Sequence, residues 1–285
     1  MVLRERVADH IYVFRSGMYA QVNAGLITTE EGCVLIDTLP YPQETQQIIQ
    51  FVKQRLRSHV RYLILTHAHA DHVYGAYLFP EAEVISHLLA REHLIKQTRP
   101  ALMEARQRNT ALAEVTLQLP TMLTEKEASI RIGGFTLVLR HAPGHSPDLI
   151  TVYIKEEKVL YAADAVMPVP YFANGGIDDL RRSLHGVLEL TPLEDVIQGH
   201  GEVLLRGEVK SVLQAQLTYL GRVEAHAQAV LAAGEGKEAL DALTLEACGY
   251  PATLMGGLAV QLHRANLYAL YGQARRRQQQ ARAAA

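Results

Sequence analysis

The sequence predicts an α/β fold, a four-layer αββα sandwich followed by a helical C-terminal extension. Strand-like apolar runs fall into two groups, residues 10–37 and 129–163, which supply the two sheets that such a sandwich needs. Segments with helical spacing of apolar residues lie between and after these groups, and they supply the outer layers. A chain of 285 residues, 48% of them hydrophobic, can bury one such core and carry an appendage.

The first sheet is expected to open as a meander. Strand-like runs occupy residues 10–14, 23–27 and 33–37, with a turn signal at residues 30–32. Residues 42–57 then carry apolar side chains at helical spacing, and residues 61–65 form another apolar strand. Strand, helix and strand in this order predict a crossover connection between parallel strands.

Two further segments read as helical. Residues 88–119 are predicted to form a polar helical insertion near the active-site mouth, and a scaffold insertion without substrate contact is the alternative. Residues 208–276 read as almost wholly helical, with breaks at residues 234–236 and 249–251. We therefore predict a catalytic domain over residues 1–205 and a helical extension over residues 206–285. The apolar residues of this extension repeat at helical spacing, at Val212, Leu213, Leu217, Leu220 and Val223. This face must pack on the sandwich or on a second subunit, so a homodimer is possible.

The run Thr66-His67-Ala68-His69-Ala70-Asp71-His72 directly follows an apolar strand. Neutral imidazole and carboxylate are ligands for zinc and related metals, and the small Ala spacers let His67 and His69 point the same way. The cluster is too rich for one tetrahedral site, so it predicts two metals. A polar loop with surface histidines is the alternative interpretation.

Three later positions place ligand-type side chains at further strand ends. His145 lies in the turn Pro143-Gly144-His145-Ser146-Pro147, after the strand-like residues 135–140. Asp164 follows the apolar residues 159–163, and His200 sits between two glycines after residues 195–198. Functional groups are commonly placed where a buried strand emerges into a loop. We expect these side chains to join the first cluster.

The order HxHxDH, PGHSP, strand-end Asp and GHG resembles the metallo-β-lactamase-fold hydrolases, over about residues 8–205. By this resemblance, a His rather than a Glu at position 69 argues against the flavodiiron branch, and an Asp rather than a Cys at position 164 argues against the lactamase subclasses that place a thiolate there. The dinuclear hydrolases of the glyoxalase II-like and lactamase-like branch remain. By this resemblance, one metal is held by His67, His69 and His145, a second by Asp71, His72 and His200, and Asp164 bridges the two.

The resemblance implies two divalent ions. Zinc is the expected metal, while manganese or iron can use the same nitrogen and oxygen ligands. Such a pair generates a bridging hydroxide at neutral pH, which would attack the carbonyl of an ester, thioester, lactone or β-lactam. A phosphodiesterase acting through the same metal site, or a non-hydrolytic iron-binding redox protein of the same fold, are the alternatives.

Two residues are candidates for catalytic roles beyond metal binding. Asp71 is expected to accept a hydrogen bond from the nucleophile and to shuttle its proton. Tyr171, in the loop after Asp164, is a candidate donor to a developing oxyanion, with a packed loop aromatic as the alternative. Asp37 and Thr66 resemble outer residues that orient the ligands. We expect structural roles for His87, His141 and His185, because they lack the strand-end setting or the companion pattern of ligand residues.

Composition narrows the partners. A formal net charge of −2 gives no electrostatic case for nucleic acid or membrane binding, so a small-molecule substrate is expected. Cys33 and Cys248 are far apart in apolar contexts, which predicts buried free thiols rather than a disulfide or a thiolate metal site. Since neither a signal peptide nor a membrane-spanning run is evident, we expect a cytoplasmic protein.

Overall fold

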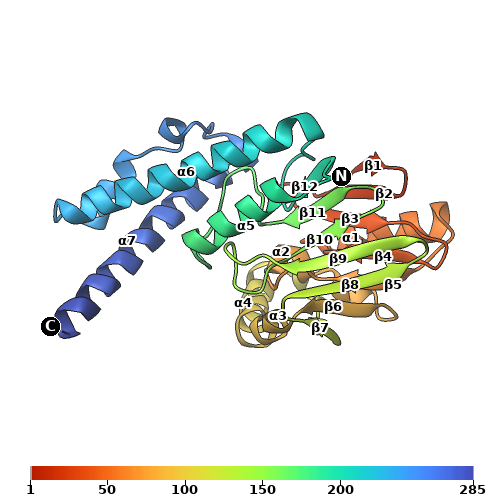
Figure 1. The fold of residues 1–285 in the computed structure, drawn as a ribbon. Helices are drawn as coiled ribbons and strands as arrows, with labels where there is room; N and C mark the ends of the chain where they lie inside the picture. The colour runs from red at the N-terminus through yellow and green to blue at the C-terminus, as the bar shows by residue number, and fades with distance from the viewer. Residues whose placement is uncertain (1, 285) are drawn as a thin grey trace.

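The computed structural model describes residues 2–284, apart from the side chains of residues 277, 278 and 281–284. The predicted fold class is confirmed. Two sheets pack face to face with helices on both outer sides, and two long helices extend the C-terminal end (Figure 1). The sandwich lies on one side of Figure 1 and the helices α6 (Arg206–Ala232) and α7 (Leu258–Ala284) lie on the other.

The first sheet has seven strands in chain order, antiparallel from β1 to β4 and parallel from β4 to β7. The strands are β1 (Leu3–Ala8), β2 (Ile11–Arg15), β3 (Asn23–Ile27), β4 (Cys33–Ile36), β5 (Val60–Ile64), β6 (Glu83–His87) and β7 (Met122–Thr124). The predicted crossover is present, because helix α1 (Pro42–Gln50) joins the parallel strands β4 and β5.

The second sheet has five strands in the order β12-β11-β10-β9-β8. Strands β8 to β11 pair antiparallel, and β12 adds parallel to β11. The strands are β8 (Glu127–Ile132), β9 (Phe135–His141), β10 (Ile150–Ile154), β11 (Val159–Ala163) and β12 (Asp195–Gln198).

Apolar side chains divide into three layers that follow the strand period of two. In β4, Cys33 and Leu35 face the helical side, while Val34 and Ile36 face the other sheet. The inner layer joins the two sheets, and in it Tyr161 of β11 packs so closely that a Cβ at Gly25 of β3 would lie 2.9 Å from its ring. Gly25 therefore permits the close approach of the two sheets.

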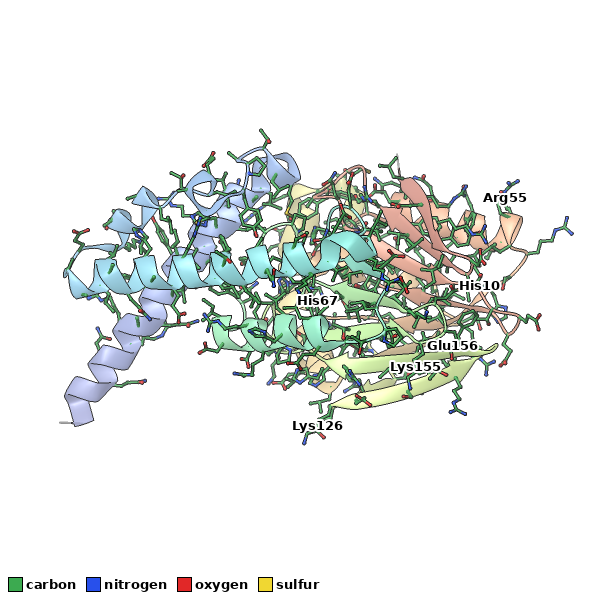
Figure 2. The ribbon with its side chains drawn as sticks, turned by 45° about the horizontal axis from the view of Figure 1, so that its top comes forward. His10, Arg55, His67, Lys126, Lys155 and Glu156 are labelled. Atoms are coloured by element: carbon green, nitrogen blue, oxygen red, sulfur yellow. The ribbon has the colours of Figure 1, made fainter. Side chains whose placement is uncertain are left out.

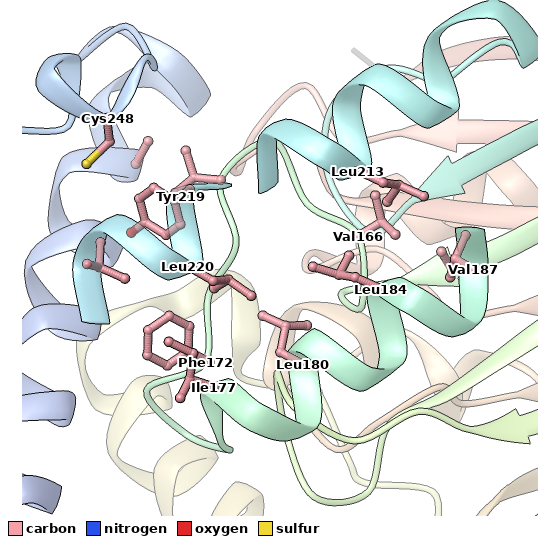
Figure 3. Close-up of a cluster of buried hydrophobic side chains, with 14 of the residues drawn as sticks. Val166, Phe172, Ile177, Leu180, Leu184, Val187, Leu213, Tyr219, Leu220 and Cys248 are labelled. Carbon is pink, nitrogen blue, oxygen red and sulfur yellow. The ribbon is translucent and has the colours of Figure 1, made fainter. Parts of the chain in front are cut away.

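The third apolar layer joins the second sheet to the C-terminal helices. Helix α5 (Ile177–Glu189) contributes Leu180 and Leu184, and α6 contributes Leu213 and Leu220, all of them buried (Figure 3). The apolar face predicted for residues 212–223 therefore packs within the chain. The division into residues 1–205 and 206–285 stays a prediction, as does the homodimer.

Several sequence predictions need correction. The insertion is helical only from 88 to 112, through α3 (Leu88–His93), a π-helical turn (Leu94–Thr98), α4 (Arg99–Arg108) and a 3₁₀ turn (Thr110–Leu112). Residues 233–257 contain short 3₁₀ turns, at Lys237–Ala242, Glu246–Cys248 and Leu254–Gly257, rather than continuous helix. The five glycines of residues 233–257 interrupt helical propagation. Helix α1 is followed by a π-helical turn, Phe51–Arg55.

The charged N-terminal residues form the edge strand β1, of which the first four residues, 3–6, are all exposed to water. Both cysteines are free and buried, as predicted. Among the residues that the structure describes, none of the helices combines the length and apolar character needed to span a bilayer. The cytoplasmic location stays a prediction.

Candidate metal centre

Four strand-end loops bring the predicted residues together at one edge of the two sheets. The loop after β5 and the short helix α2 (Ala70–Val73) carry the first four candidates. The loop between β9 and β10 carries His145, Asp164 follows β11, and His200 follows β12. The seven candidates converge, and apart from His69 and Asp71 they are buried. Figure 2 shows His67 on the side of the sandwich toward the C-terminal helices, away from His10 and Arg55.

Asp164 lies at the middle of this convergence. Its Oδ2 lies 3.2 Å from Nε2 of His145 and 3.4 Å from Nε2 of His200. The Nε2 of His67 is 3.9 Å from the same oxygen, and Nε2 of His72 is 3.3 Å from Oδ1. Imidazoles from both halves of the chain therefore face one carboxylate.

The seven side chains form two neighbouring groups, and within each group the nitrogen and oxygen atoms lie within 4.8 Å of one another. One group is His67, His69, His145 and Asp164, and the other is Asp71, His72 and His200. These groups match the two sets that the resemblance implied. A third group adds Asp37 to His67 and His72, but the oxygens of Asp37 are already engaged by neighbouring groups.

The imidazoles are oriented from behind by hydrogen bonds to their Nδ1 atoms. His145 donates to the Tyr171 carbonyl at 3.1 Å, and His200 donates to the Ala20 carbonyl at 2.9 Å. His72 donates to Asp37, with 3.0 Å between Nδ1 and Oδ2. A proton held on Nδ1 leaves the Nε2 lone pair free to face inward, which is the form that binds a metal.

Asp37 links two of the ligand-type histidines. It accepts hydrogen bonds from the Thr66 amide and hydroxyl, each at 2.7 Å, and that hydroxyl lies 3.0 Å from Nδ1 of His67. Asp37 is fully buried and adopts φ +58°, an uncommon conformation for a residue with a side chain. From this conformation the Asp37 carboxylate contacts His72 directly and reaches His67 through the Thr66 hydroxyl. Asp37 and Thr66 therefore lie behind the ligand-type histidines, the position that the resemblance implies for them.

Gly199 makes room for Asp164. A Cβ at this position would lie 1.7 Å from Asp164 Oδ1, so any side chain would displace the carboxylate. The Gly199 amide donates to the Ala163 carbonyl at 2.8 Å, and Ala163 itself adopts φ +46°. The glycine before His200 is therefore required by the close approach of the β12 loop to the end of β11.

Burial and the charges of neighbouring groups lower the pKa of some histidines in the cluster and raise that of others. Burial lowers the pKa of His67 and His69, and that of His145 to about 4, so these rings are neutral near pH 7. Burial also opposes charge on His72 and His200, but the carboxylates of Asp164 and Asp71 together outweigh it and raise the pKa of both.

The same pairing acts on the carboxylate in return. Burial alone would raise the pKa of Asp164, but the positive charges of His200 and His72 hold it well below its ordinary value. The cluster thus presents an ionised carboxylate amid imidazoles, a donor set typical of divalent metal sites.

Unpaired buried atoms show that a cation fits here. Nε2 of His67, Nε2 of His72 and Oδ1 of Asp164 are buried and have no hydrogen-bonding partner among the described residues. Nδ1 of His69 also lies only 2.8 Å from Nε2 of His145. Buried polar atoms without partners are costly, and a metal bound between them would satisfy them.

A cavity of about 480 Å³ opens over the cluster. The helical insertion lines it with His93, Gln97, Thr98 and Ala101, so the insertion does reach the active-site mouth. Tyr171 lines the cavity too, and its ring centroid lies 5.5 Å from that of His145.

Sequence reasoning missed several residues around this cavity. Asp148, 1% exposed, accepts a hydrogen bond from the Ala68 amide at 2.8 Å and pairs with His93 at 3.2 Å. The only signal in the sequence was the acid three residues after His145. Tyr19, in the loop before β3, and the C-terminal residues of the cavity carried no local signal.

Within residues 2–284, His87, His141 and His185 belong to none of the metal-type groups. The prediction that they lack the strand-end setting is wrong for two of them. His87 ends β6 and His141 ends β9, so both do have the strand-end setting. Their rings stack on each other at 4.1 Å. His87 also bonds to the Glu125 carbonyl, whereas His185 lies within α5.

Comparison with known proteins identifies the family. The family model described as the metallo-beta-lactamase superfamily matches residues 18–201, more than half of the chain, and this range spans all seven candidates. The chain belongs to the metallo-beta-lactamase superfamily.

Within this superfamily, the chain is 29% identical over 199 residues to hydroxyacylglutathione hydrolase GloC of Haemophilus influenzae, covering 67% of this chain and 90% of that protein. It is 26% identical over 189 residues to the probable metallo-hydrolase YqgX of Bacillus subtilis, covering 64% and 85%. It is also 24% identical to the Beta-lactamase-like protein 2 homolog of Caenorhabditis elegans, of whose length it spans 56%. Family and relatives together support a metal-dependent hydrolase.

Solved structures show the same fold. A metallo-beta-lactamase from Pontibacter korlensis superposes with a TM-score of 0.60 at 19% identity, covering 75% of this chain and 99% of that one. The sec-alkylsulfatase Pisa1 from Pseudomonas sp. superposes with a TM-score of 0.76 at 17% identity, covering 96% of this chain and 50% of that one. The superposition on Pisa1 covers 96% of this chain and so extends into the C-terminal helices, whereas the superposition on the Pontibacter korlensis enzyme covers 75%.

Proposed function

We propose that the chain is a dinuclear metal hydrolase, with zinc as the expected metal, that cleaves an ester, thioester, lactone or β-lactam at its carbonyl. The observation that carries this proposal is the convergence of two ligand groups on Asp164, with buried Nε2 and Oδ1 atoms left without partners among the described residues. Two divalent ions, when bound, supply Lewis acidity and lower the pKa of water toward neutrality.

In this proposal, His67, His69 and His145 hold one ion, Asp71, His72 and His200 hold the other, and Asp164 contacts both. The hydrogen bonds to Asp37, Tyr171 and Ala20 fix the rings before any metal arrives, which limits reorganisation on binding. The neutral state of His67, His69 and His145 favours their group as the tighter site.

Asp71 combines a metal-facing and a solvent-facing position. Its Oδ2 lies 3.7 Å from Nε2 of His200 and 4.0 Å from Nε2 of His72, yet the side chain is 20% exposed and lines the cavity. It can therefore accept a proton from an attacking water while it remains beside the ligands.

Tyr171 is proposed as a hydrogen-bond donor to the oxyanion that develops on the substrate. Its carbonyl orients His145, and its ring lines the cavity. Burial raises the pKa of the phenol, so the hydroxyl keeps its proton at neutral pH and can donate it.

The test is a substrate screen with metal-loaded and chelator-treated protein. We expect hydrolysis of at least one carbonyl substrate class, lost on chelation and restored by zinc, in a panel of esters, thioesters, lactones, β-lactams, phosphodiesters and an alkyl sulfate. Turnover of a phosphodiester alone would replace the proposal by the phosphodiesterase alternative. Bound iron with oxygen-dependent turnover and no hydrolysis would replace it by the redox alternative.

A further inference from the structure

The cavity above the metal centre has two unlike sides. Its floor is the His and Asp cluster, and one wall comes from the C-terminal region through Met255, Leu258 and Leu262. Met167, in the loop after β11, adds to the apolar lining. Met255, Leu258 and Leu262 come from a segment far from the ligand loops in sequence, so the fold has to bring them over the floor.

The backbone at the start of this wall is strained. Met255 adopts φ +53° although it carries a side chain, and Gly256 and Gly257 follow with φ +65° and +90°. This sharp kink separates the 3₁₀ turn Leu254–Gly257 from α7, and Met255 is only 6% exposed. Strained residues at a ligand cavity persist when the surrounding contacts hold them, and here the result is an apolar side chain placed at the cavity.

The charged residues of the cavity are acidic. Asp71, Asp148 and Asp164 line it, and within the described part of the chain no Lys or Arg is among the lining residues. His93 is the nearest candidate cation outside the metal cluster, because a hydrogen bond to Asp148 raises its pKa. Its charge is matched by that same carboxylate 3.2 Å away, so it offers no net charge to a substrate.

We propose that this cavity binds the uncharged, apolar acyl chain of the substrate, and that the wall of Met255, Leu258 and Leu262 selects it. This rests on the proposed hydrolytic function of the metal centre. With the ester carbonyl at the metal centre, an acyl chain that ends in a carboxylate would bury that charge against the leucine and methionine wall, where no Lys or Arg among the lining residues pairs it. A methyl-ended chain instead gains roughly fourfold in binding for each methylene removed from water.

Two matched esters test the proposal directly. The para-nitrophenyl ester of hexanoic acid and the mono-para-nitrophenyl ester of adipic acid have acyl chains of equal length, but the second ends in a carboxylate. We expect kcat/KM for the hexanoyl ester to exceed that for the adipoyl ester by at least about thirtyfold, because the unpaired charge is poorly solvated in the cavity. Equal values, or a preference for the adipoyl ester, would overturn the proposal.

Substitutions on α7 test whether the wall sets the preference for the hexanoyl ester. Leu262→Arg places a cation in the wall, and Val260→Arg places one on the exposed face of the same helix, where Val260 is 42% exposed. We expect Leu262→Arg to reduce the hexanoyl preference at least about tenfold and Val260→Arg to leave it within about twofold. An equal effect of both would show that the wall does not set the preference.

A milder change covers the case in which Leu262→Arg does not fold. Leu258→Ala removes apolar surface from the wall without adding charge. It should lower the ratio of kcat/KM for the hexanoyl ester to that for the acetyl ester by about threefold to tenfold. An unchanged ratio in a folded variant would contradict the role of the wall.

Binding without turnover separates this inference from the proposed function. Hexanamide and adipamic acid can be compared by saturation-transfer NMR on the full-length protein, with and without metal. If no ester is cleaved but hexanamide binds and adipamic acid does not, the hydrolytic function fails while the cavity assignment stands. If both compounds bind equally, the cavity assignment fails whatever the enzyme hydrolyses.

Discussion

The floor and the wall of the cavity are built in opposite ways. On the floor, imidazoles such as His72 and His200 are buried, and each is fixed by a hydrogen bond to its outer nitrogen. On the wall, Leu258 and Leu262 are half-buried and lie on a helix that packs mainly through apolar contacts. Hydrogen bonds specify one geometry, whereas apolar contacts tolerate exchange of similar side chains.

This difference predicts a division of labour. Changes to the floor should remove metals or chemistry for every substrate, whereas changes to the wall should alter only which substrate is preferred. The following predictions test the floor, beginning with the residue that both ligand groups share.

The largest effect is expected for Asp164→Asn. The amide keeps the size of the side chain but removes the charge that the histidines face, so binding of at least one ion should weaken. We expect activity to fall by at least about a thousandfold, together with a lower metal content by elemental analysis. Asp179→Asn on α5 is the matched control. Full activity and full metal content in Asp164→Asn would contradict the central place of Asp164.

Asp71→Ala should reduce hydrolysis by at least about a hundredfold, because it removes the group that orients the attacking water. The fold should survive, since Asp71 lies in the short helix α2 with its side chain 20% exposed, rather than in a buried strand. Steady-state kinetics and thermal unfolding measure both effects, with Asp178→Ala on α5 as control. Wild-type turnover would deny Asp71 a catalytic role.

Asp37→Asn tests the hydrogen bonds behind the floor. The amide can still accept from the Thr66 amide, but it loses the charge that stabilises the proton on His72 Nδ1. We expect metal affinity to fall by about tenfold to a hundredfold, as is usual when such an outer partner is removed. Competition with a chromogenic chelator measures this. If affinity is unchanged while only thermal stability falls, Asp37 has a purely structural role.

The smallest effect is expected for the ion pair between His93 and Asp148, which both line the cavity. The hydrogen bond to Asp148 raises the pKa of His93 above 6.5, with Glu92 and Lys96 as the other charged neighbours. The folded state therefore holds this proton more tightly than the unfolded state, so the stabilisation is complete below pH 6.5 and is lost as pH rises through the folded pKa. Wild type should be more stable than His93→Gln at about pH 6 by roughly 1 kcal/mol or less, and this margin should shrink by about pH 8. Urea unfolding measures the margin; one that grows with pH would contradict the pairing.

The floor could be predicted from the sequence because each of its residues follows a recognisable strand or turn. His67, Asp164 and His200 stand directly after apolar runs, and parallel strands deliver their ends to one edge. The two sheets were predictable for the same reason, because strands such as β3, β4, β10 and β11 are short apolar runs that are buried throughout. The amphipathic helix α5 went unnoticed, although its apolar positions have helical spacing.

The wall could not be predicted to the residue. Met255 and Leu262 reach the cavity only because α6 and α7 fold back over the second sheet, and the kink at Met255 depends on tertiary contacts. The short strand β7 was missed because its three residues pair only with β6 across a long connection. A local sequence pattern does not indicate which distant segments will pair or pack together.

The most direct measurement is the number of metal ions per chain. Protein purified without chelator, or reconstituted with zinc, should contain close to two metal ions per chain by inductively coupled plasma mass spectrometry, because Asp164 belongs to one ligand group and lies within 3.4 Å of His72 and His200 of the other. The ratio should fall when either group is altered. A ratio that stays at one or below after reconstitution would contradict the dinuclear centre on which this account rests.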